Sequence, residues 1–101
     1  MAQELSKRAN WSERALEKYL RAEVRKLGGE CLKYSNMLAN GYPDRLCLFS
    51  GGRSIWVELK STGKRPTQLQ VHRLHQLREM GHWAVWADTR EKIDKLLEPF
   101  R

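Results

Sequence analysis

Two strand-like runs joined by a short glycine turn are the feature that most constrains this fold. Residues 44–49 and 53–60 are rich in aliphatic and aromatic side chains, and Ser50-Gly51-Gly52 lies between them. Two such runs around a glycine turn predict an antiparallel β-hairpin. The other elements are therefore placed relative to this hairpin.

A helix and a strand are expected before the hairpin. Apolar residues recur at helical spacing over residues 12–27, which predicts an amphipathic helix. Asn10 or Ser12 would cap the start of this helix, and Gly28-Gly29 would end it. A strand over 30–35 and a loop over 36–43 would then lead into the hairpin.

Two helices and one strand are expected after the hairpin. Pro66 would open a helix that ends at Gly81. Asp88, followed three residues later by Glu91, has the pattern of a capping box for the last helix. The expected elements are a basic loop over 61–65, a helix over 66–80, a strand over 82–87 and a helix that ends before Pro99. The order α-β-β-β-α-β-α predicts an α/β fold with a small mixed sheet flanked by helices.

The composition predicts one globular domain with a polyanionic partner. The 101 residues suit a single core, and 41% of them are hydrophobic. Residues 1–10 are expected to form a loose tail. Nineteen Lys and Arg against 12 Asp and Glu give a net charge of +7. This excess favours nucleic acid as the partner, although a basic protein that is merely soluble would share it.

The cysteines and the hydropathy predict where the protein acts. Cys31 and Cys47 lie in apolar strand-like runs without a metal-binding spacing, so both are expected to be reduced. No apolar run is long enough to cross a bilayer, and the N-terminus lacks a signal sequence. We therefore expect a cytoplasmic protein with no membrane partner.

Three charged side chains are expected to meet at the open end of the hairpin. In the strand 53–60, Glu58 and Lys60 share a face and lie about 7 Å apart. A hairpin centred on the two glycines sets Asp44 opposite Leu59, and a one-residue bulge would bring it opposite Glu58 or Lys60. Two close carboxylates repel unless a divalent cation lies between them, and a cation with a neighbouring ammonium suits phosphodiester hydrolysis. An ordinary solvated Glu-Lys pair is the alternative.

The motifs around these residues resemble those of a nuclease superfamily. Pro43-Asp44 and Glu58-Leu59-Lys60 are similar to the PD and ExK elements of the PD-(D/E)xK nucleases. More narrowly, the chain resembles a stand-alone VRR-NUC domain, a nuclease module known from phage proteins and larger DNA-repair nucleases. The residues that carry the resemblance are Glu17, Leu20, Val24, Gly28-Gly29, Lys33, Gly41, Pro43-Asp44-Arg45, Val57 to Lys60 and Gln70.

The resemblance implies a restriction-endonuclease-like fold and a metal-dependent endonuclease that hydrolyses DNA. It implies that Asp44, Glu58 and the backbone carbonyl of Leu59 bind Mg²⁺ or Mn²⁺. Lys60 would be the catalytic lysine, and Glu17 would help to hold the metal through water. Gln70 would be an accessory residue of the same catalytic site.

Helix wheels bear on two of these residues. Gln70 falls inside the apolar face of the helix expected over 66–80, where its amide needs a partner. The metal site or buried backbone at the helix start would supply that partner. Glu17 only flanks the apolar stripe of the first helix, whereas Glu13 lies closer to its centre. Glu13 is therefore the alternative to Glu17.

The resemblance also implies a homodimer that cleaves branched DNA such as a four-way (Holliday) junction. One chain would hold one site, so paired nicks would need two chains. A non-catalytic nucleic-acid-binding module is the alternative, as is a nuclease that acts on other DNA or on RNA. The basic residues expected to contact phosphates, with solubility as their other explanation, are Arg25, Lys26, Lys33, Arg45, Arg53, Lys64 and Arg65.

Overall fold

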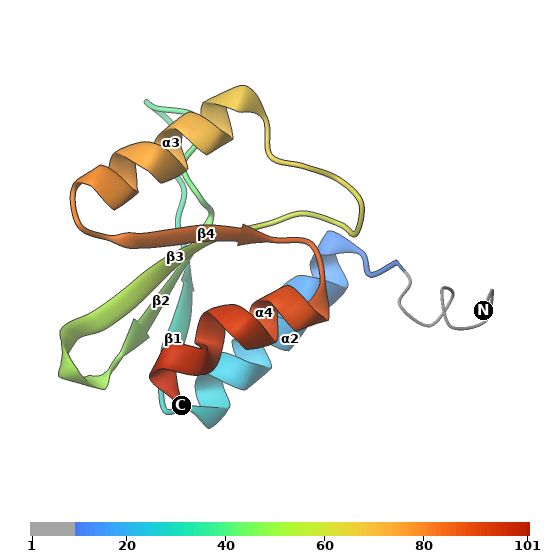
Figure 1. Cartoon of the computed structure of the whole chain (residues 1–101), viewed down its shortest axis with the longest axis vertical. Helices are drawn as coiled ribbons and strands as arrows, with labels where there is room; N and C mark the ends of the chain where they lie inside the picture. The colour runs from blue at the N-terminus through green and yellow to red at the C-terminus, as the bar shows by residue number, and fades with distance from the viewer. Residues whose placement is uncertain (1–9) are drawn as a thin grey trace.

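A four-stranded mixed sheet lies at the centre of the protein (Figure 1). The computed structural model describes residues 10–101, so nearly all of the tail expected over 1–10 lies outside the described part. The sheet order is β1-β2-β3-β4, with β1 to β3 antiparallel and β4 parallel to β3. The predicted mixed sheet is confirmed. The strands are β1 (Glu30–Lys33), β2 (Arg45–Phe49), β3 (Arg53–Leu59) and β4 (Trp83–Ala87).

Helices cover both faces of this sheet. The helices α2 (Glu13–Lys26) and α4 (Arg90–Leu97) lie side by side on one face, where Leu16, Leu20 and Ile93 are fully buried. The helix α3 (Gln68–Glu79) covers the other face with Leu74 and Leu77, over Trp56 and Ala84. A short helix, η2 (Glu98–Phe100), follows α4. Trp56 thus packs beneath α3, as core packing predicts.

The hairpin turn sets a register that differs from the expected one. Ser50–Gly52 form a short 3-10 helix, η1, in which Gly51 and Gly52 have φ of 80° and 73°. A three-residue turn makes Phe49 the partner of Arg53, whereas a turn of only Gly51 and Gly52 would make Ser50 its partner. The ladder reaches Arg45 opposite Val57, and its next step sets Asp44 opposite Glu58. The predicted pairing of Asp44 with Leu59 is therefore wrong, and no bulge is needed.

The first two helix starts agree only in part with expectation. Ser12 caps α2, because its Oγ accepts a hydrogen bond from the Ala15 N–H at 3.0 Å. Pro66 does not open α3; Thr67 caps it instead, and Gln70 completes a capping box. The signal was present in the sequence as Thr67-x-x-Gln70, the pattern of that box.

The last helix begins one residue later than a cap at Asp88 would imply. Thr89 caps α4 through its Oγ1, which accepts from the Lys92 N–H at 3.1 Å. The predicted capping box of Asp88 and Glu91 is wrong. The Asp88 carboxylate accepts instead from the Gly63 N–H at 3.0 Å and lies 2.8 Å from the Lys92 ammonium.

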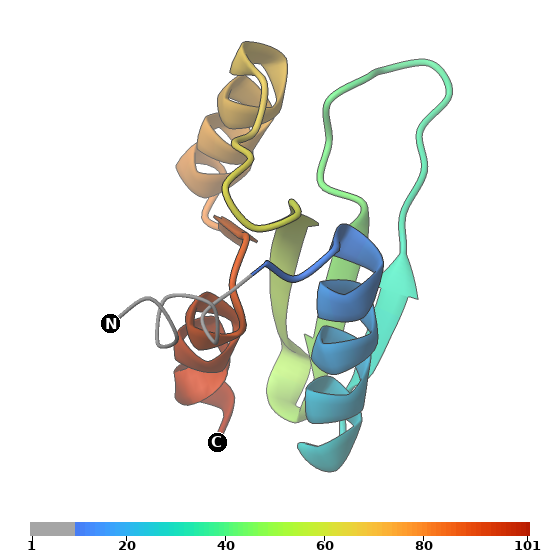
Figure 2. The same ribbon diagram turned by 90° about the vertical axis from the view of Figure 1, so that its right-hand side faces the viewer.

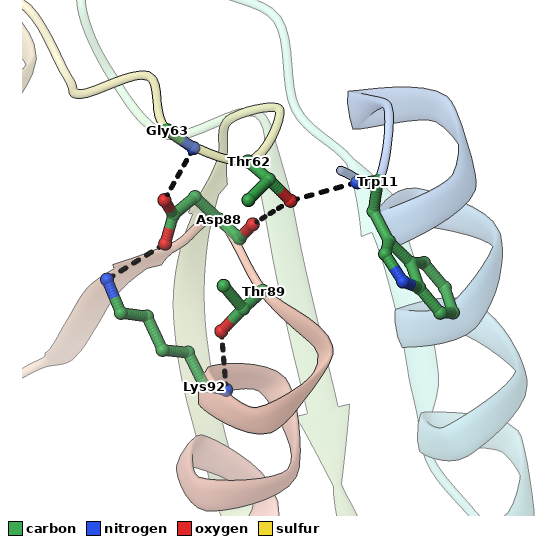
Figure 3. A network of polar contacts seen from close by, with 6 residues as sticks. All are labelled: Trp11, Thr62, Gly63, Asp88, Thr89 and Lys92. Carbon is green, nitrogen blue, oxygen red and sulfur yellow. Dashed lines mark hydrogen bonds and ion pairs between the residues drawn. The ribbon is translucent and has the colours of Figure 1, made fainter. Parts of the chain in front are cut away.

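These contacts belong to a network that joins three elements at one end of the sheet (Figure 3). The Thr62 hydroxyl donates to the Asp88 carbonyl at 2.8 Å and accepts from the Trp11 N–H at 3.0 Å. The Thr62 N–H donates in return to the Trp11 carbonyl at 3.0 Å. The start of α2, the segment after β3 and the end of β4 are thereby held together, and Figure 2 shows the start of α2 beside the end of β3.

Two further expectations concern the cysteines and membranes. Cys31 and Cys47 are free thiols at directly opposed positions of β1 and β2. Among the described residues, no helix is long and apolar enough to cross a membrane.

Candidate active site

Asp44 and Glu58 face each other where β2 begins and β3 ends. Glu58 is 5% exposed and alternates along β3 with residues of the core face, so it points to the α3 side with Trp56. The register, continued one step beyond the pair of Arg45 and Val57, brings Asp44 across from it, and the charge of Asp44 acts on Glu58. Opposed residues of an antiparallel pair share a face, with Cβ atoms about 4.5–5.5 Å apart. The two carboxylates therefore lie on the same side of the sheet.

Burial and mutual repulsion disfavour the ionised forms of this pair. Burial, and then the charge of Asp44, raise the pKa of Glu58 to about 7, although Lys60 opposes the shift. Burial also raises the pKa of Asp44, and Glu17 adds to this while Arg45 acts against it. The Oδ1 atom of Asp44 is buried and has no hydrogen-bond partner among the described residues. A cation between the two groups would satisfy that oxygen and remove the repulsion.

Lys60 and Gln70 both approach Glu58. The Lys60 ammonium lies 3.6 Å from Glu58 Oε2, and its side chain is 18% exposed. The Gln70 amide donates from Nε2 to the same oxygen at 3.4 Å, while its Oε1 accepts from the Thr67 N–H at 2.9 Å. The two partners considered for Gln70 are thus present together. The cap at the start of α3 fixes the amide, and the amide faces Glu58.

Glu13 and Glu17, the two α2 carboxylates considered for the site, have different surroundings. Glu17 Oε1 lies 2.8 Å from the Arg45 guanidinium, which is itself almost completely buried. The charge of Glu13, one turn earlier, instead contributes to raising the pKa of Glu58. Glu17 therefore neutralises Arg45 and its charge also acts on Asp44, whereas the charge of Glu13 acts on Glu58.

The predicted phosphate-contacting residues are divided between two ends of the molecule. Lys33 lies beside Arg45 in the β1–β2 ladder, and the exposed Lys64 and Arg65 lie between Lys60 and α3. Arg45 is buried in its ion pair. The three that lie at the turn end of the hairpin, away from Asp44 and Glu58, are Arg25, Lys26 and Arg53.

The donor set fits a cation that keeps part of its hydration shell. The described residues contain no group of three or more His, Cys, Asp or Glu side chains that could hold a metal ion. Asp44 and Glu58 provide two carboxylates, and the carbonyl of Leu59 adjoins Glu58 in sequence. Mg²⁺ is commonly bound by one or two carboxylates, with water completing its octahedral shell.

Two features define the restriction-endonuclease-like class of nucleases. One is a small mixed sheet with helices on both faces, and the other is an acidic pair with a lysine at the open end of a hairpin in that sheet. The solved structure of a VRR_NUC domain superposes with a TM-score of 0.81 and 25% identity, over 90% of this chain and 100% of that one. The protein named "Putative nuclease p44", from Acyrthosiphon pisum secondary endosymbiont phage 1, is 37% identical over 79 residues. This alignment spans 78% of the chain and 85% of the phage protein. No protein-family model matches the sequence. The chain belongs to the VRR-NUC family of nuclease domains.

Proposed function

We propose that this nuclease is a metal-dependent endonuclease that hydrolyses DNA phosphodiester bonds at Asp44, Glu58 and Lys60. One observation supports the proposal: the Asp44 Oδ1 atom is buried without a hydrogen-bond partner among the described residues, and the register, continued one step past Arg45 and Val57, brings Asp44 opposite Glu58. A buried polar atom without a partner is costly, so the arrangement favours a ligand at this position.

The ligand we assign to this position is Mg²⁺ or Mn²⁺. Asp44 and Glu58 would hold the ion, together with the Leu59 carbonyl that the family resemblance implies. Hard oxygen donors suit both ions. When bound, such an ion lowers the pKa of a water molecule and polarises a phosphoryl oxygen.

Lys60 and Gln70 both act next to Glu58 Oε2. The Lys60 ammonium is only partly exposed, and we assign it to orient the attacking water and to stabilise negative charge on the phosphoryl group. Gln70 holds Glu58 Oε2 with an amide that the helix cap has already oriented. Its role is to position the carboxylate.

Between Glu13 and Glu17, we assign Glu13 to the outer shell of the metal. Glu17 is paired with Arg45 at 2.8 Å, whereas the charge of Glu13 acts on Glu58. We expect Glu13→Gln to weaken Mn²⁺ binding about tenfold, as loss of an outer-shell partner does. Glu17→Gln should instead lower stability, because it leaves a buried guanidinium without its carboxylate.

We further propose that the substrate is branched DNA and that the enzyme acts as a homodimer in the cytoplasm of a bacterial or phage-infected cell. One chain carries one such site, so two coordinated nicks in a four-way junction need two chains. Paired nicks from a dimer of defined mass would support this part of the proposal.

Cleavage assays and metal titrations test the proposal separately. The substrates are linear duplex, single-stranded, flap and four-way-junction DNA, with Mg²⁺, Mn²⁺ or EDTA. We expect cleavage only with metal, and a loss of about 100-fold or more in Asp44→Asn and Lys60→Ala. Glu79→Gln, which alters an exposed carboxylate on α3, is the matched control and should cleave normally.

Calorimetry with Mn²⁺ gives a readout that does not depend on activity. Wild type and Glu79→Gln should bind the ion, and Asp44→Asn should bind it much more weakly. Cleavage by Lys60→Ala at the wild-type rate would reject the assigned mechanism. DNA binding without cleavage of any substrate would instead leave a non-catalytic binding module.

A further inference from the structure

Four cations form a continuous stripe along the exposed side of α2. Arg14, Lys18, Arg21 and Arg25 follow one another at intervals of three or four residues, and all four are exposed. At 100° per residue they fall within an arc of about 60°, roughly 130° from the centre of the buried face. We call these four residues the α2 stripe.

The cations of the α2 stripe have no ion-pair partners within residues 10–101. Glu17, which flanks the stripe, is already paired with Arg45. Elsewhere on the surface, Lys26, Lys92 and Arg101 all lie near carboxylates. Within the described part of the chain, the positive charge of the stripe is therefore left available to a ligand.

The stripe lies on the helix that covers the opposite face of the sheet from Asp44 and Glu58, and it runs from the end of the sheet that holds them along the β1 edge. Its first member, Arg14, lies in the first turn of α2, close to the Trp11–Thr62 contact that joins this helix to the segment after Lys60. Its last two members line a hollow of about 190 Å³ between α2 and β1, which is also lined by Glu30. Lys33, on β1, extends the basic surface beside Arg45.

We propose that the α2 stripe binds the phosphate backbone of a duplex DNA arm that leads away from the scissile phosphate. This inference rests on the proposed function. The eleven helical steps from Arg14 to Arg25 span about 16 Å, which matches the rise of about five base pairs. A row of unpaired cations this long fits a regular line of phosphates better than it fits a single anion. The stripe positions the arm and does not read base sequence.

The salt dependence of binding tests the stripe directly. Dissociation constants for a four-way junction would be measured between 50 and 200 mM salt in EDTA, so that no cleavage occurs. The test variant combines Arg14→Gln, Lys18→Gln and Arg21→Gln. Each phosphate contact contributes about −0.9 to the slope of the logarithm of the association constant against the logarithm of the salt concentration. The loss of three contacts should therefore make this slope shallower by about 2.7. Over that range the wild-type affinity should decrease about 40-fold more than that of the variant.

A charge-matched control removes two arginines and one lysine elsewhere. Arg90→Gln, Lys95→Gln and Arg101→Gln change exposed residues of α4 and the C-terminus. This variant should keep the wild-type salt slope, and circular dichroism should confirm that both variants are folded. Equal slopes for the stripe variant, the control and the wild type would overturn the inference.

Two further outcomes separate this inference from the proposed function. If wild type binds DNA with the predicted stripe dependence but cleaves none, the stripe stands and the catalytic proposal fails. If wild type cleaves DNA but the stripe variant binds with an unchanged slope, the catalytic proposal stands and the stripe fails. Tighter, stripe-dependent binding to duplex RNA of the same length would overturn the assignment to DNA.

Discussion

The Thr62 hydroxyl is the single group whose removal should most weaken the contact between α2 and the end of the sheet. It accepts from the Trp11 N–H at 3.0 Å and donates to the Asp88 carbonyl at 2.8 Å (Figure 3). Thr62→Val keeps the shape of the side chain and removes both hydrogen bonds. Each bond contributes about 1 kcal/mol net, and a partly buried N–H without a partner costs about 1 kcal/mol more. We expect a loss of about 2–3 kcal/mol in the free energy of unfolding.

Chemical and thermal denaturation, followed by circular dichroism, measure this loss. A domain of this size loses about 4–8 °C of melting temperature per kcal/mol, so the shift should be about 10–20 °C. Thr62→Ser keeps the hydroxyl and is the control; it should stay within about 1 kcal/mol of wild type, the cost of one methyl group. A Val variant within about 0.5 kcal/mol of wild type, or a Ser variant as unstable as the Val variant, would refute this reasoning.

Three further predictions use denaturation in EDTA. The raised pKa of Glu58, about 7 against an ordinary 4.5, means that the folded protein keeps a proton that the unfolded chain releases, so stability falls as pH rises through this window. Glu58→Gln should remove that fall and gain about 3 kcal/mol at pH 8; a wild-type curve that is flat from pH 4 to 8 would contradict this. Burial tends to raise the pKa of Asp88, but Lys92 and the Gly63 N–H lower it overall. Ionised Asp88 therefore stabilises the folded protein above the ordinary aspartate pKa, and this stabilisation is lost as the pH falls through the lower pKa of the folded state. Asp88→Asn should lack this loss of stability between pH 5 and 2. Gly29→Ala should destabilise more than Gly28→Ala, since its Cβ would meet the Leu48 carbonyl at 2.5 Å whereas Gly28 has open space around it; the opposite order would show that the positive φ of Gly28 is the larger effect.

The hairpin shows how far local sequence determines a site. The alternation of side chains along β3 correctly predicted that Glu58 and Lys60 share a face, because that alternation is a property of any strand. The partner of Asp44 was predicted wrongly. Ser50-Gly51-Gly52 can form a turn of two or three residues, and the conformation adopted in the fold sets the register.

The capping residues show a similar division. Ser12 was identified from its residue type, because a hydroxyl at a helix start bonds the exposed N–H groups wherever the helix packs. Asp88 and Thr89 are adjacent and are both good capping residues. The choice between them depends on Gly63 and Lys92, which occupy the Asp88 carboxylate. Gly63 lies 25 residues away in sequence, so no local pattern contains this information.

The charged groups of α2 depend still more on packing. Helical spacing placed Glu13 closer than Glu17 to the centre of the apolar face, whereas the family resemblance implied Glu17. The fold pairs Glu17 with Arg45 from β2 and leaves Glu13 to act on Glu58 from β3. The same packing leaves the α2 stripe exposed, although its spacing was readable in the sequence.

The sequence alone determined the order of elements, the mixed sheet, the family resemblance and the shared face of Glu58 and Lys60. These depend on side-chain periodicity, turn residues and motif spacing, which act over a few residues. Tertiary structure alone decided which residue faces Asp44, which side chain caps α4 and which carboxylate of α2 stays free of Arg45. Each of these is a competition between chemically similar neighbours, and it is decided by groups that only folding brings within hydrogen-bonding distance.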